Sequence, residues 1–304
     1  MDLPRITVIT PTLNCRRFID EALVSLREQG YPDLESIVVD GGSTDDTVSI
    51  ARSYTFCKVN VSPCAGLYAA LNEGIRASTG KIISFLNGDD ILAPGILKRI
   101  GETYAVNNDV DIIGGRAILF EDDEGGQRRI VDNYDRYVGK TLDLQTLMFG
   151  APLINSHFFN IDVFRETGLF DTSYRLAADR EFMIRCYRNN PRIVYTQSLA
   201  YQYRRHPGSL TLNSGKSNAY AMGLEHIRIA DEFSESDNRN LRRLAARGRD
   251  DGAVTALAAC LRNRQFTGFF SFFLRHILRD PLFTLRLPFA VGGKVRRRFL
   301  SLRQ

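Results

Sequence analysis

The stretch IISFLNGDD, residues 82–90, decides the fold, because an apolar run typical of a buried strand ends there in two adjacent carboxylates, Asp89 and Asp90. At the carboxyl end of a parallel strand the sheet opens into a crevice in which ligands bind. A hard divalent cation takes oxygen ligands there and commonly uses substrate phosphates as the others. Asn-Gly-Asp also favours turns, so the stretch predicts either a cation site or an ordinary strand-to-loop turn.

Two strand-like segments precede this stretch, and each leads into a polar loop and then a helix. Residues 6–10 form a β-branched run before Pro11 and Thr12, and an amphipathic pattern follows them. Residues 36–39 form the second run and lead into Asp40 and two glycines, which allow a ligand to approach the backbone closely. Strands and helices alternate throughout this half, which predicts an α/β fold with a doubly wound sheet.

Three motifs stand in this order: VITPTLN at residues 8–14, VDGGSTD at residues 39–45 and FLNGDD at residues 85–90. Together they resemble family 2 of the inverting glycosyltransferases, in particular the branch that builds bacterial surface polysaccharides. The resemblance implies a GT-A fold, a Rossmann-like domain that binds a nucleotide sugar, with Mn²⁺ or Mg²⁺ as cofactor. We expect this catalytic domain at residues 1–212 and a mainly helical C-terminal region at residues 213–304.

The resemblance also implies roles for single residues. Pro11 and Thr12 match the family's first loop, where main-chain groups meet the nucleotide base. Asp40 matches a carboxylate that accepts an N–H of the base, commonly uracil, although a turn-forming Asp at a strand end is the alternative. Asp89 is expected to face the ribose or the sugar, and Asp90 to hold the metal on the diphosphate.

A downstream segment, LAADREFMIR at residues 176–185, resembles the part of the family that carries the catalytic base. Many members have Glu-Asp where this chain has Ala178 and Asp179, so the resemblance implies Asp179 as the general base. It would take the proton of the acceptor hydroxyl as the oxygen attacks the anomeric carbon, in a single displacement with inversion. The alternative is a helix N-terminal acid that pairs with Arg180 or Arg185 on the surface.

Two histidines and an arginine complete the expected site. The segment YRRHPGSLT, residues 203–211, resembles a late family motif near the diphosphate, where Arg205 and His206 would offset the charge of the leaving nucleotide. His157 lies in a segment that family members use near the acceptor. Lone histidines are usually packing or surface residues, and the phenylalanines after His157 indicate a packed setting.

Competing chemistries fit the same residues less well. Residues 215–217 (GKS) resemble the end of a phosphate loop, but Leu210 stands where that loop requires Gly. No Gly-x-Gly-x-x-Gly follows the first strand, which argues against a dinucleotide-binding oxidoreductase. Asp179 and Glu181 point to different sides of a helix, so they do not form the facing carboxylate pair of a glycoside hydrolase.

The remaining alternative is a non-catalytic nucleotide-sugar-binding or scaffold subunit of a polysaccharide assembly complex. Cys64, Ala69 and Ala178 stand where relatives often carry acids, and such a degenerate pocket would suit a scaffold. The four acids of the expected site are all retained, which favours an active enzyme. The sequence thus predicts a metal-dependent hexosyltransferase that uses a nucleotide-diphospho-sugar, first of all a UDP-sugar, and a glycan or lipid-linked glycan acceptor in cell-surface polysaccharide biosynthesis.

The composition limits how large the core can be and indicates which cellular compartment to expect. A chain of 304 residues with 44% hydrophobic content can bury a full α/β core and a small appendage. Its five cysteines show neither metal-binding spacing nor an even disulfide framework, which suits a reducing compartment. The first five residues lead directly into a strand without a signal peptide, so a cytoplasmic location is expected.

Basic charge gathers at the C-terminal end. The net charge is +5, and the residues after Asp280 alone carry +6, which leaves −1 for the rest. Phenylalanines and leucines recur at helical spacing within residues 266–278, and no run reaches the length of a transmembrane helix. We therefore expect residues 264–304 to form an amphipathic segment on the anionic inner face of the cytoplasmic membrane. No nucleic-acid-binding motif accompanies the charge. The alternative is a helix packed on the catalytic domain.

Overall fold

The computed structural model describes residues 2–63, 66–123, 125–134, 139, 142–209 and 218–301, the last segment with side chains to residue 296. Cys64 and residues 210–217, which include the GKS stretch, lie outside the described residues. The chain forms two compact units, one of Met1–Leu142 and Ala151–Arg205, the other of Asp143–Gly150 and His206–Gln304. The expected domain boundary at residue 212 falls in an undescribed stretch and stays a prediction.

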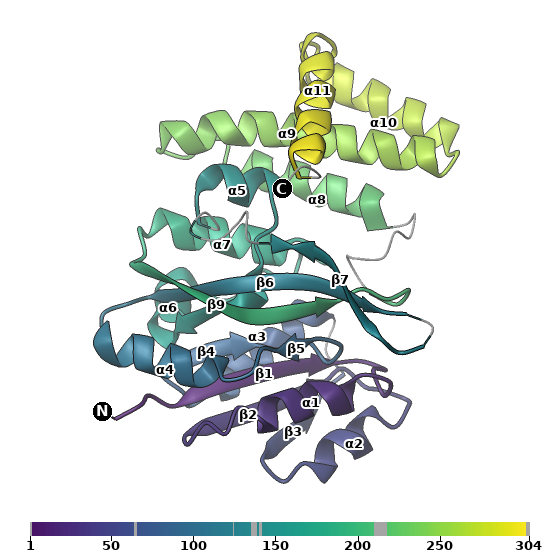
Figure 1. Ribbon diagram of the computed structural model, residues 1–304. Coiled ribbons are helices and arrows are strands. Elements are labelled where there is room, and N and C mark those ends of the chain that lie inside the picture. Colours follow the sequence, from purple (N-terminus) through teal and green to yellow (C-terminus); the bar gives the residue numbers. More distant parts are fainter. Residues whose placement is uncertain are drawn as a thin grey trace. The chain divides into compact units, whose positions relative to one another are not determined.

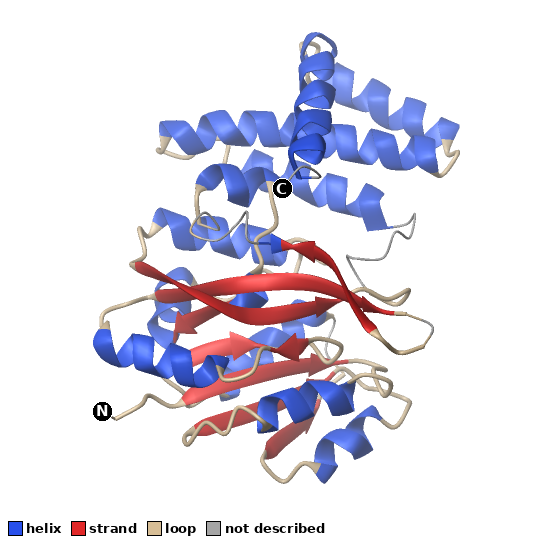
Figure 2. Cartoon of the chain, in the orientation of Figure 1, coloured by secondary structure: helices blue, strands red, loops and turns tan. Residues whose placement is uncertain are grey.

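The first unit is built on one mixed sheet, which has nine strands in the described part of the chain (Figures 1 and 2). Its strands are β1 (Ile6–Thr12), β2 (Leu34–Asp40), β3 (Cys57–Val61), β4 (Ile82–Phe85), β5 (Ile91–Leu92), β6 (Ile112–Asp122), β7 (Arg128–Asn133), β8 (His157–Asn160) and β9 (Ile193–Arg204). Their order is β3-β2-β1-β4-β8-β6-β9-β5, and β7 pairs with β6. Strands β3, β2, β1 and β4 are parallel, whereas β8 is antiparallel to both β4 and β6.

Helices cover both faces of the parallel strands. The helices of this unit are α1 (Ile19–Arg27), α2 (Thr47–Ser53), α3 (Leu67–Ala77), α4 (Ile96–Val106), α6 (Ile161–Thr167) and α7 (Ala178–Arg188), with the 3₁₀ turn η2 (Ile154–Ser156). Figure 1 shows α1 and α2 on one face and α3 on the other. Because both faces are covered, every residue of β1 is buried, as expected for a parallel strand. The predicted α/β fold is confirmed.

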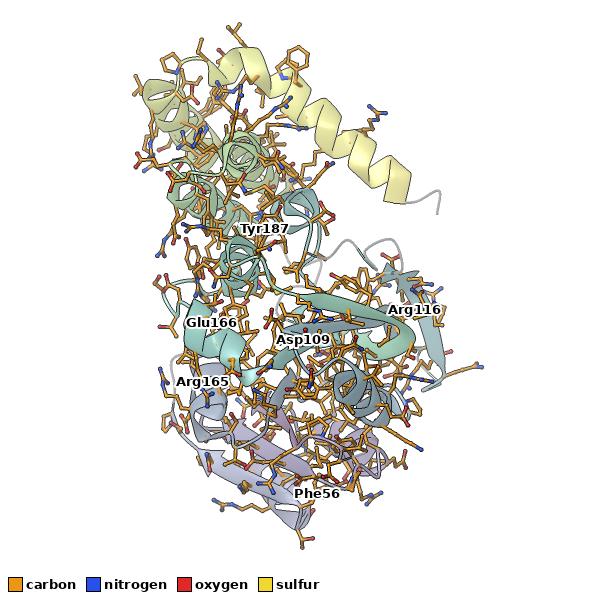
Figure 3. All side chains as sticks on the ribbon, turned by 90° about the vertical axis from the view of Figure 1, so that its left-hand side faces the viewer. Phe56, Asp109, Arg116, Arg165, Glu166 and Tyr187 are labelled. Atoms are coloured by element: carbon orange, nitrogen blue, oxygen red, sulfur yellow. The ribbon has the colours of Figure 1, made fainter. Side chains whose placement is uncertain are left out.

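The core of this unit joins sheet and helices. Phe56, labelled in Figure 3, packs at its margin. One buried acid is part of this interior: Glu35 of β2 accepts hydrogen bonds from the Thr7 hydroxyl (2.7 Å), the Thr79 amide (2.7 Å) and Lys58 Nζ (2.6 Å). Burial by itself raises the pKa of Glu35, but these donors outweigh it and lower the pKa to about 2. Glu35 thus ties β2 to β1, to β3 and to the turn before β4.

The second unit is helical, as predicted. It contains α5 (Leu144–Phe149), α8 (Asn218–Glu232), α9 (Arg239–Arg262), α10 (Phe266–Arg279) and α11 (Phe283–Ser301). Helices α8 and α9 approach so closely at Gly223 and Gly252 that a Cβ on Gly223 would lie 2.7 Å from the Gly252 carbonyl oxygen. None of the described helices is long and apolar enough to cross a membrane.

Candidate functional site

Strands β1 and β2 end side by side, and their loops are joined through Asp40. Thr12 and Asp40 are register partners in this parallel pair. The buried carboxylate of Asp40 accepts hydrogen bonds from the hydroxyls of Thr12 (2.8 Å) and Ser43 (2.6 Å) and from the amides of Gly42 (3.0 Å) and Ser43 (2.7 Å). Burial opposes ionisation, but these hydrogen bonds lower the pKa of Asp40 below its ordinary value. Asp40 is therefore an ionised residue that shapes the loop.

The contact expected between Asp40 and the nucleotide base stays a prediction. Four donors of the protein already bind the Asp40 carboxylate, which offers about four acceptor positions. Pro11 and Thr12 are the buried last residues of β1. The loop proper begins at Leu13, which is exposed, and Asn14, whose side chain accepts the Thr44 amide over 2.8 Å. Main-chain contact with a base near Thr12 stays a prediction.

The two carboxylates that follow β4 have different surroundings. Asp89 is half-buried, whereas Asp90 is 3% exposed. One oxygen of Asp90 accepts the Tyr201 hydroxyl (2.8 Å) and the Asn87 side-chain amide (3.0 Å), and the other accepts the main-chain amide of Arg204 (2.7 Å). Burial, and next the charge of Asp89, raise the pKa of Asp90 to about 8, although the hydrogen bonds oppose this rise.

The metal-binding role expected for Asp90 stays a prediction. Three donors of the protein engage its two oxygens, and a carboxylate offers about four acceptor positions. Asp89 has the more accessible carboxylate of the pair. Within the described residues no three His, Cys, Asp or Glu side chains gather around one metal position. A cation that takes one or two carboxylates and completes its shell with the diphosphate of a substrate fits this pair.

Arg204, the last residue of β9, holds in place the turn after β4 that contains Asp89 and Asp90. We call it the acidic turn. The Nε of Arg204 donates to the main-chain oxygen of Asp89 over 2.9 Å, and its guanidinium also pairs with Asp122 and Glu21. The side chain is buried between two rings, whose centroids lie 5.0 and 4.7 Å from the guanidinium carbon: Phe18 and Phe120. Sequence analysis missed this residue, since its partners are scattered over the chain; the only local signal was the pair of arginines at the end of a strand-like run.

Asp179 lies in the first turn of α7 and is half-buried. Burial raises the pKa of its carboxyl above the ordinary value, while the charge and amide of Arg180 and a hydrogen bond from Tyr68 moderate the rise. The Tyr68 hydroxyl also reaches the Leu176 carbonyl oxygen, 3.2 Å away. Surface pairing with Arg185 does not occur, because Arg185 binds Glu181. A carboxyl with a raised pKa suits a general base better than an ordinary surface acid does.

Tyr203 connects the two acidic parts of the site. Burial, and then the charges of Asp90 and Asp179 among its neighbours, raise the pKa of Tyr203 well above its ordinary value. Its ring lies 4.6 Å, centroid to centroid, from that of Tyr201, the tyrosine that donates to Asp90. Asp90 and Asp179 are thus close enough to the same phenol to affect it electrostatically, although 89 positions separate them in sequence.

The sequence model described as Glycosyl transferase family 2 matches residues 7–163, more than half of the chain. The chain belongs to glycosyl transferase family 2. Among its curated relatives, a PGL/p-HBAD biosynthesis glycosyltransferase of Mycobacterium tuberculosis is 30% identical over 201 residues, 64% of this chain and 73% of the relative. An uncharacterized glycosyltransferase of Bacillus subtilis, EpsJ, is 29% identical over 222 residues, 69% of this chain and 63% of the relative.

Solved structures of glycosyltransferases share the fold. Staphylococcus aureus TarS 1–349 in complex with UDP-GlcNAc superposes with a TM-score of 0.60 at 20% identity, over 85% of this chain and 73% of TarS 1–349. The mannosyltransferase PcManGT of Pyrobaculum calidifontis, in complex with GDP-Man and Mn²⁺, has a TM-score of 0.60 at 16% identity, over 97% of this chain and 88% of that protein. The predicted GT-A fold is confirmed by these neighbours.

Arg205 and His206 are the expected residues from the end of β9 and the loop after it. Nε of Arg205 donates to Glu121 over 2.9 Å, so its guanidinium serves an ion pair in this structure. His206 belongs to the second unit, where its ring accepts the Gly208 amide over 3.2 Å. The roles of Arg205 and His206 near the diphosphate stay predictions.

His157 is a packed residue of β8. It is fully buried in β8, with Nδ1 2.9 Å from the Leu153 carbonyl oxygen, and its ring packs beside Phe159 and Tyr195. Burial lowers the pKa of His157 to about 4, so the imidazole is neutral at pH 7. The structure shows the packed setting that the neighbouring phenylalanines indicated, and the role of His157 near the acceptor stays a prediction.

Proposed function

We propose that this family 2 enzyme is an inverting glycosyltransferase that moves a sugar from a nucleotide-diphospho-sugar to a hydroxyl of a glycan or lipid-linked glycan. The donor that we propose is a UDP-sugar. The observation that carries the proposal is the turn after β4, where Asp89 and Asp90 follow the carboxyl end of a strand within the part of the chain that matches glycosyl transferase family 2. In the proposed site this turn binds the donor and Asp179 meets the acceptor. TarS in complex with UDP-GlcNAc supports the choice of UDP.

In this proposal Asp179 is the catalytic base. Its carboxylate takes the proton of the acceptor hydroxyl as that oxygen forms a bond to the anomeric carbon. The bond from the anomeric carbon to the diphosphate breaks on the opposite side, and the nucleoside diphosphate leaves with the bonding electrons. One displacement inverts the configuration. The raised pKa of Asp179, caused first by burial, strengthens it as a base relative to an ordinary aspartate.

We propose a divalent cation, Mn²⁺ or Mg²⁺, as cofactor, with Asp89 as its protein ligand in place of Asp90. Asp89 is the more exposed residue of the pair, and Tyr201, Asn87 and Arg204 donate to the oxygens of Asp90. When bound, such a cation neutralises charge on the diphosphate leaving group. PcManGT, whose complex contains GDP-Man and Mn²⁺, supports this cofactor. Asp90 and Arg204 then act as positioning residues that fix the turn.

The biological setting of the proposal is cell-surface polysaccharide or glycolipid biosynthesis at the inner face of the cytoplasmic membrane. The Mycobacterium tuberculosis relative, which bears the name of a PGL/p-HBAD biosynthesis enzyme, supports an acceptor of this kind. A lipid-linked acceptor would hold its reacting hydroxyl near the membrane surface, so an enzyme that acts on it gains from binding there.

A donor panel tests the function. UDP-, GDP- and dTDP-sugars are incubated with the full chain, Mn²⁺ or Mg²⁺ and lipid-linked glycan acceptors, and release of the nucleoside diphosphate is measured. We expect one donor to be consumed by the wild type and not by Asp179→Asn. If UDP binds but no donor in the panel is consumed with any acceptor, the scaffold alternative is favoured over the enzyme.

A further inference from the structure

Helix α10 has two apolar faces, and only one of them packs inside the second unit. Phe272 and His276 are buried on the inner face, where Phe272 contributes to a core with Ala253 and Leu257 of α9. The opposite side carries four side chains at intervals of four residues, with 57 to 82% of each exposed. We call them the outer stripe: Phe266, Phe270, Leu274 and Leu278. Four residues are close to one helical turn, so the four lie on one face.

The exposed apolar surface continues past the end of α10. Leu282, Leu285 and Phe289, at the turn and on α11, are 60 to 81% exposed. Single exposed leucines are ordinary on a soluble protein, but seven large exposed apolar side chains within residues 266–289 are more than scattered exposures and favour an interaction site. The structure also shows which phenylalanines of α10 lie on the inner face and which on the outer face, an assignment that the sequence did not allow. Phe269 and Phe273 pack against the inner core, whereas Phe270 points to solvent.

The charges beside the outer stripe are positive. Residues 252–304 contain ten Lys and Arg and a single acid, Asp280. Arg275 and Arg279 follow Leu274 and Leu278 by one residue each, about 100° further around the helix, so they border the stripe with exposed side chains. Arg279 also pairs with Asp231 at 3.2 Å.

The acids that face this region from within the unit are engaged in ion pairs. Asp250 binds Arg286 at 2.8 Å, Asp251 binds Lys294 at 3.1 Å, and Asp280 also pairs with Arg286. Asp231 likewise pairs with Arg249 and with Arg279. The ten basic residues of 252–304 outnumber these four acids, so the exposed border of the stripe stays positive. An apolar face bordered by arginines is the pattern of a helix that lies in a membrane interface, where the arginine heads reach anionic headgroups. A second copy docked on the same face would bring like charges together, which disfavours self-association.

We propose that the outer stripe and its continuation on α11 dock this protein on an anionic membrane surface, with the Phe and Leu side chains in the interface and the bordering arginines at the headgroups. The inference rests on the proposed action on lipid-linked acceptors, but its test requires no sugar transfer.

Vesicle sedimentation tests the apolar contribution. The full chain is mixed with phosphatidylcholine vesicles that contain phosphatidylglycerol, or with phosphatidylcholine alone. In the triple variant Phe270→Ser, Leu274→Ser and Leu278→Ser we expect partitioning to anionic vesicles to fall at least about tenfold, at both low and high salt, with an unchanged melting temperature. The matched control is Val106→Ser with Ile130→Ser, two exposed apolar residues of the first unit, which should leave partitioning unchanged. An inner-face change, Phe272→Ser, should lower the melting temperature instead.

Charge substitutions test the electrostatic contribution. Arg275→Gln with Arg296→Gln should weaken partitioning about tenfold at about 50 mM salt and less than about twofold at about 500 mM, since salt screens the attraction. Arg52→Gln with Arg188→Gln, exposed arginines of the first unit, should have no such effect.

Three results would overturn the proposal: a wild type that never sediments with anionic vesicles, equal loss in the control variants, or a wild-type dimer that the triple variant dissociates without any binding to lipid. Activity on a short soluble acceptor is measured separately. Its absence would count against the proposed function and leave the membrane result standing.

Discussion

Nε of Arg204 donates a hydrogen bond to the main-chain oxygen of Asp89 over 2.9 Å, and the amide of Arg204 donates to Asp90 over 2.7 Å. These bonds join the end of β9 to the turn after β4, although β8 and β6 lie between the two strands in the sheet. The pairing of β5 with β9 holds the residues directly after the acidic turn, and the buried Arg204 side chain holds the turn itself. Because Arg204 also binds Asp122 and Glu21, its charge is balanced inside the site.

Arg204→Lys should weaken donor binding. Lysine keeps the positive charge but loses the planar fork that reaches Asp89, Asp122 and Glu21 together. By analogy with residues that orient metal ligands, we expect the affinity for UDP in the presence of Mn²⁺ to fall about 10- to 100-fold, with a lower melting temperature. Calorimetry and thermal melting measure both. Arg205→Lys, at the adjacent half-buried position, is the matched control and should have the smaller effect; equal effects would argue against the special role of Arg204.

Asp89→Asn and Asp90→Asn should separate metal binding from stability. Asp89→Asn should abolish the part of UDP affinity that depends on Mn²⁺, because the cation needs an anionic oxygen, and leave the melting temperature nearly unchanged. Asp90→Asn should destabilise the fold by about 1 to 3 kcal/mol, since its amide nitrogen would face a hydrogen-bond donor. UDP titrations with and without Mn²⁺ decide the assignment. Loss of the metal effect in Asp90→Asn alone would restore the role that the sequence predicted for Asp90.

Asp179→Asn should leave UDP binding nearly intact and lower turnover at least about 100-fold, which is a typical effect of losing a general base. The amide cannot accept the proton of the acceptor hydroxyl. Single-turnover kinetics with saturating donor measure the chemical step. Turnover at the wild-type rate in this variant would remove Asp179 from the mechanism.

The pH dependence should report the environment of Asp179. A base acts in its ionised form, so activity should fall as the pH drops through its pKa, which burial raises above 3.8. A hydrogen bond from Tyr68 lowers that pKa, so Tyr68→Phe should move the acid limb of kcat/KM to higher pH. Tyr54→Phe, at a site remote from α7 in sequence, should leave the limb in place. A shift to lower pH in Tyr68→Phe would be inconsistent with this arrangement.

The sequence was sufficient to predict the fold because its signals are local. The apolar runs of β1, β2 and β4 each end in polar residues, and the helices between them have clear periodicity. The residue roles were harder to predict. Whether Asp40 or Asp90 can accept a ligand depends on which donors surround it, and the partners of Asp90 include Tyr201 and Arg204, more than 110 positions away. The spacing of residues along the sequence does not reveal such contacts.

The C-terminal helices show the same division between local and tertiary information. The spacing of apolar residues predicted an amphipathic α10, but apolar side chains surround much of this helix. Only packing against α9 distinguishes the inner Phe269 and Phe273 from the outer Phe270. The inner face of α10 thus packs within its own unit, whereas packing on the catalytic domain, the alternative raised by the sequence, stays a prediction.

Glu35 should make stability depend on pH between 4.5 and 2. Its pKa in the folded protein is lowered to about 2, from the ordinary glutamate value of 4.5. Burial raises this pKa, but the hydrogen bonds from Lys58, Thr7 and Thr79 outweigh burial. A lowered pKa means that the stabilisation is complete above pH 4.5 and is lost as the pH falls toward 2. Its size is about 3 kcal/mol by the usual relation between pKa shift and free energy. Glu35→Gln should therefore lower the free energy of unfolding at pH 7 by about that amount and flatten its pH dependence in this window.

Denaturant unfolding at a series of pH values measures the pH dependence of stability, with Glu28→Gln, an exposed acid at the end of α1, as the control. If the wild type and Glu35→Gln lose stability in parallel between pH 4.5 and 2, other carboxylates account for the acid sensitivity and Glu35 does not.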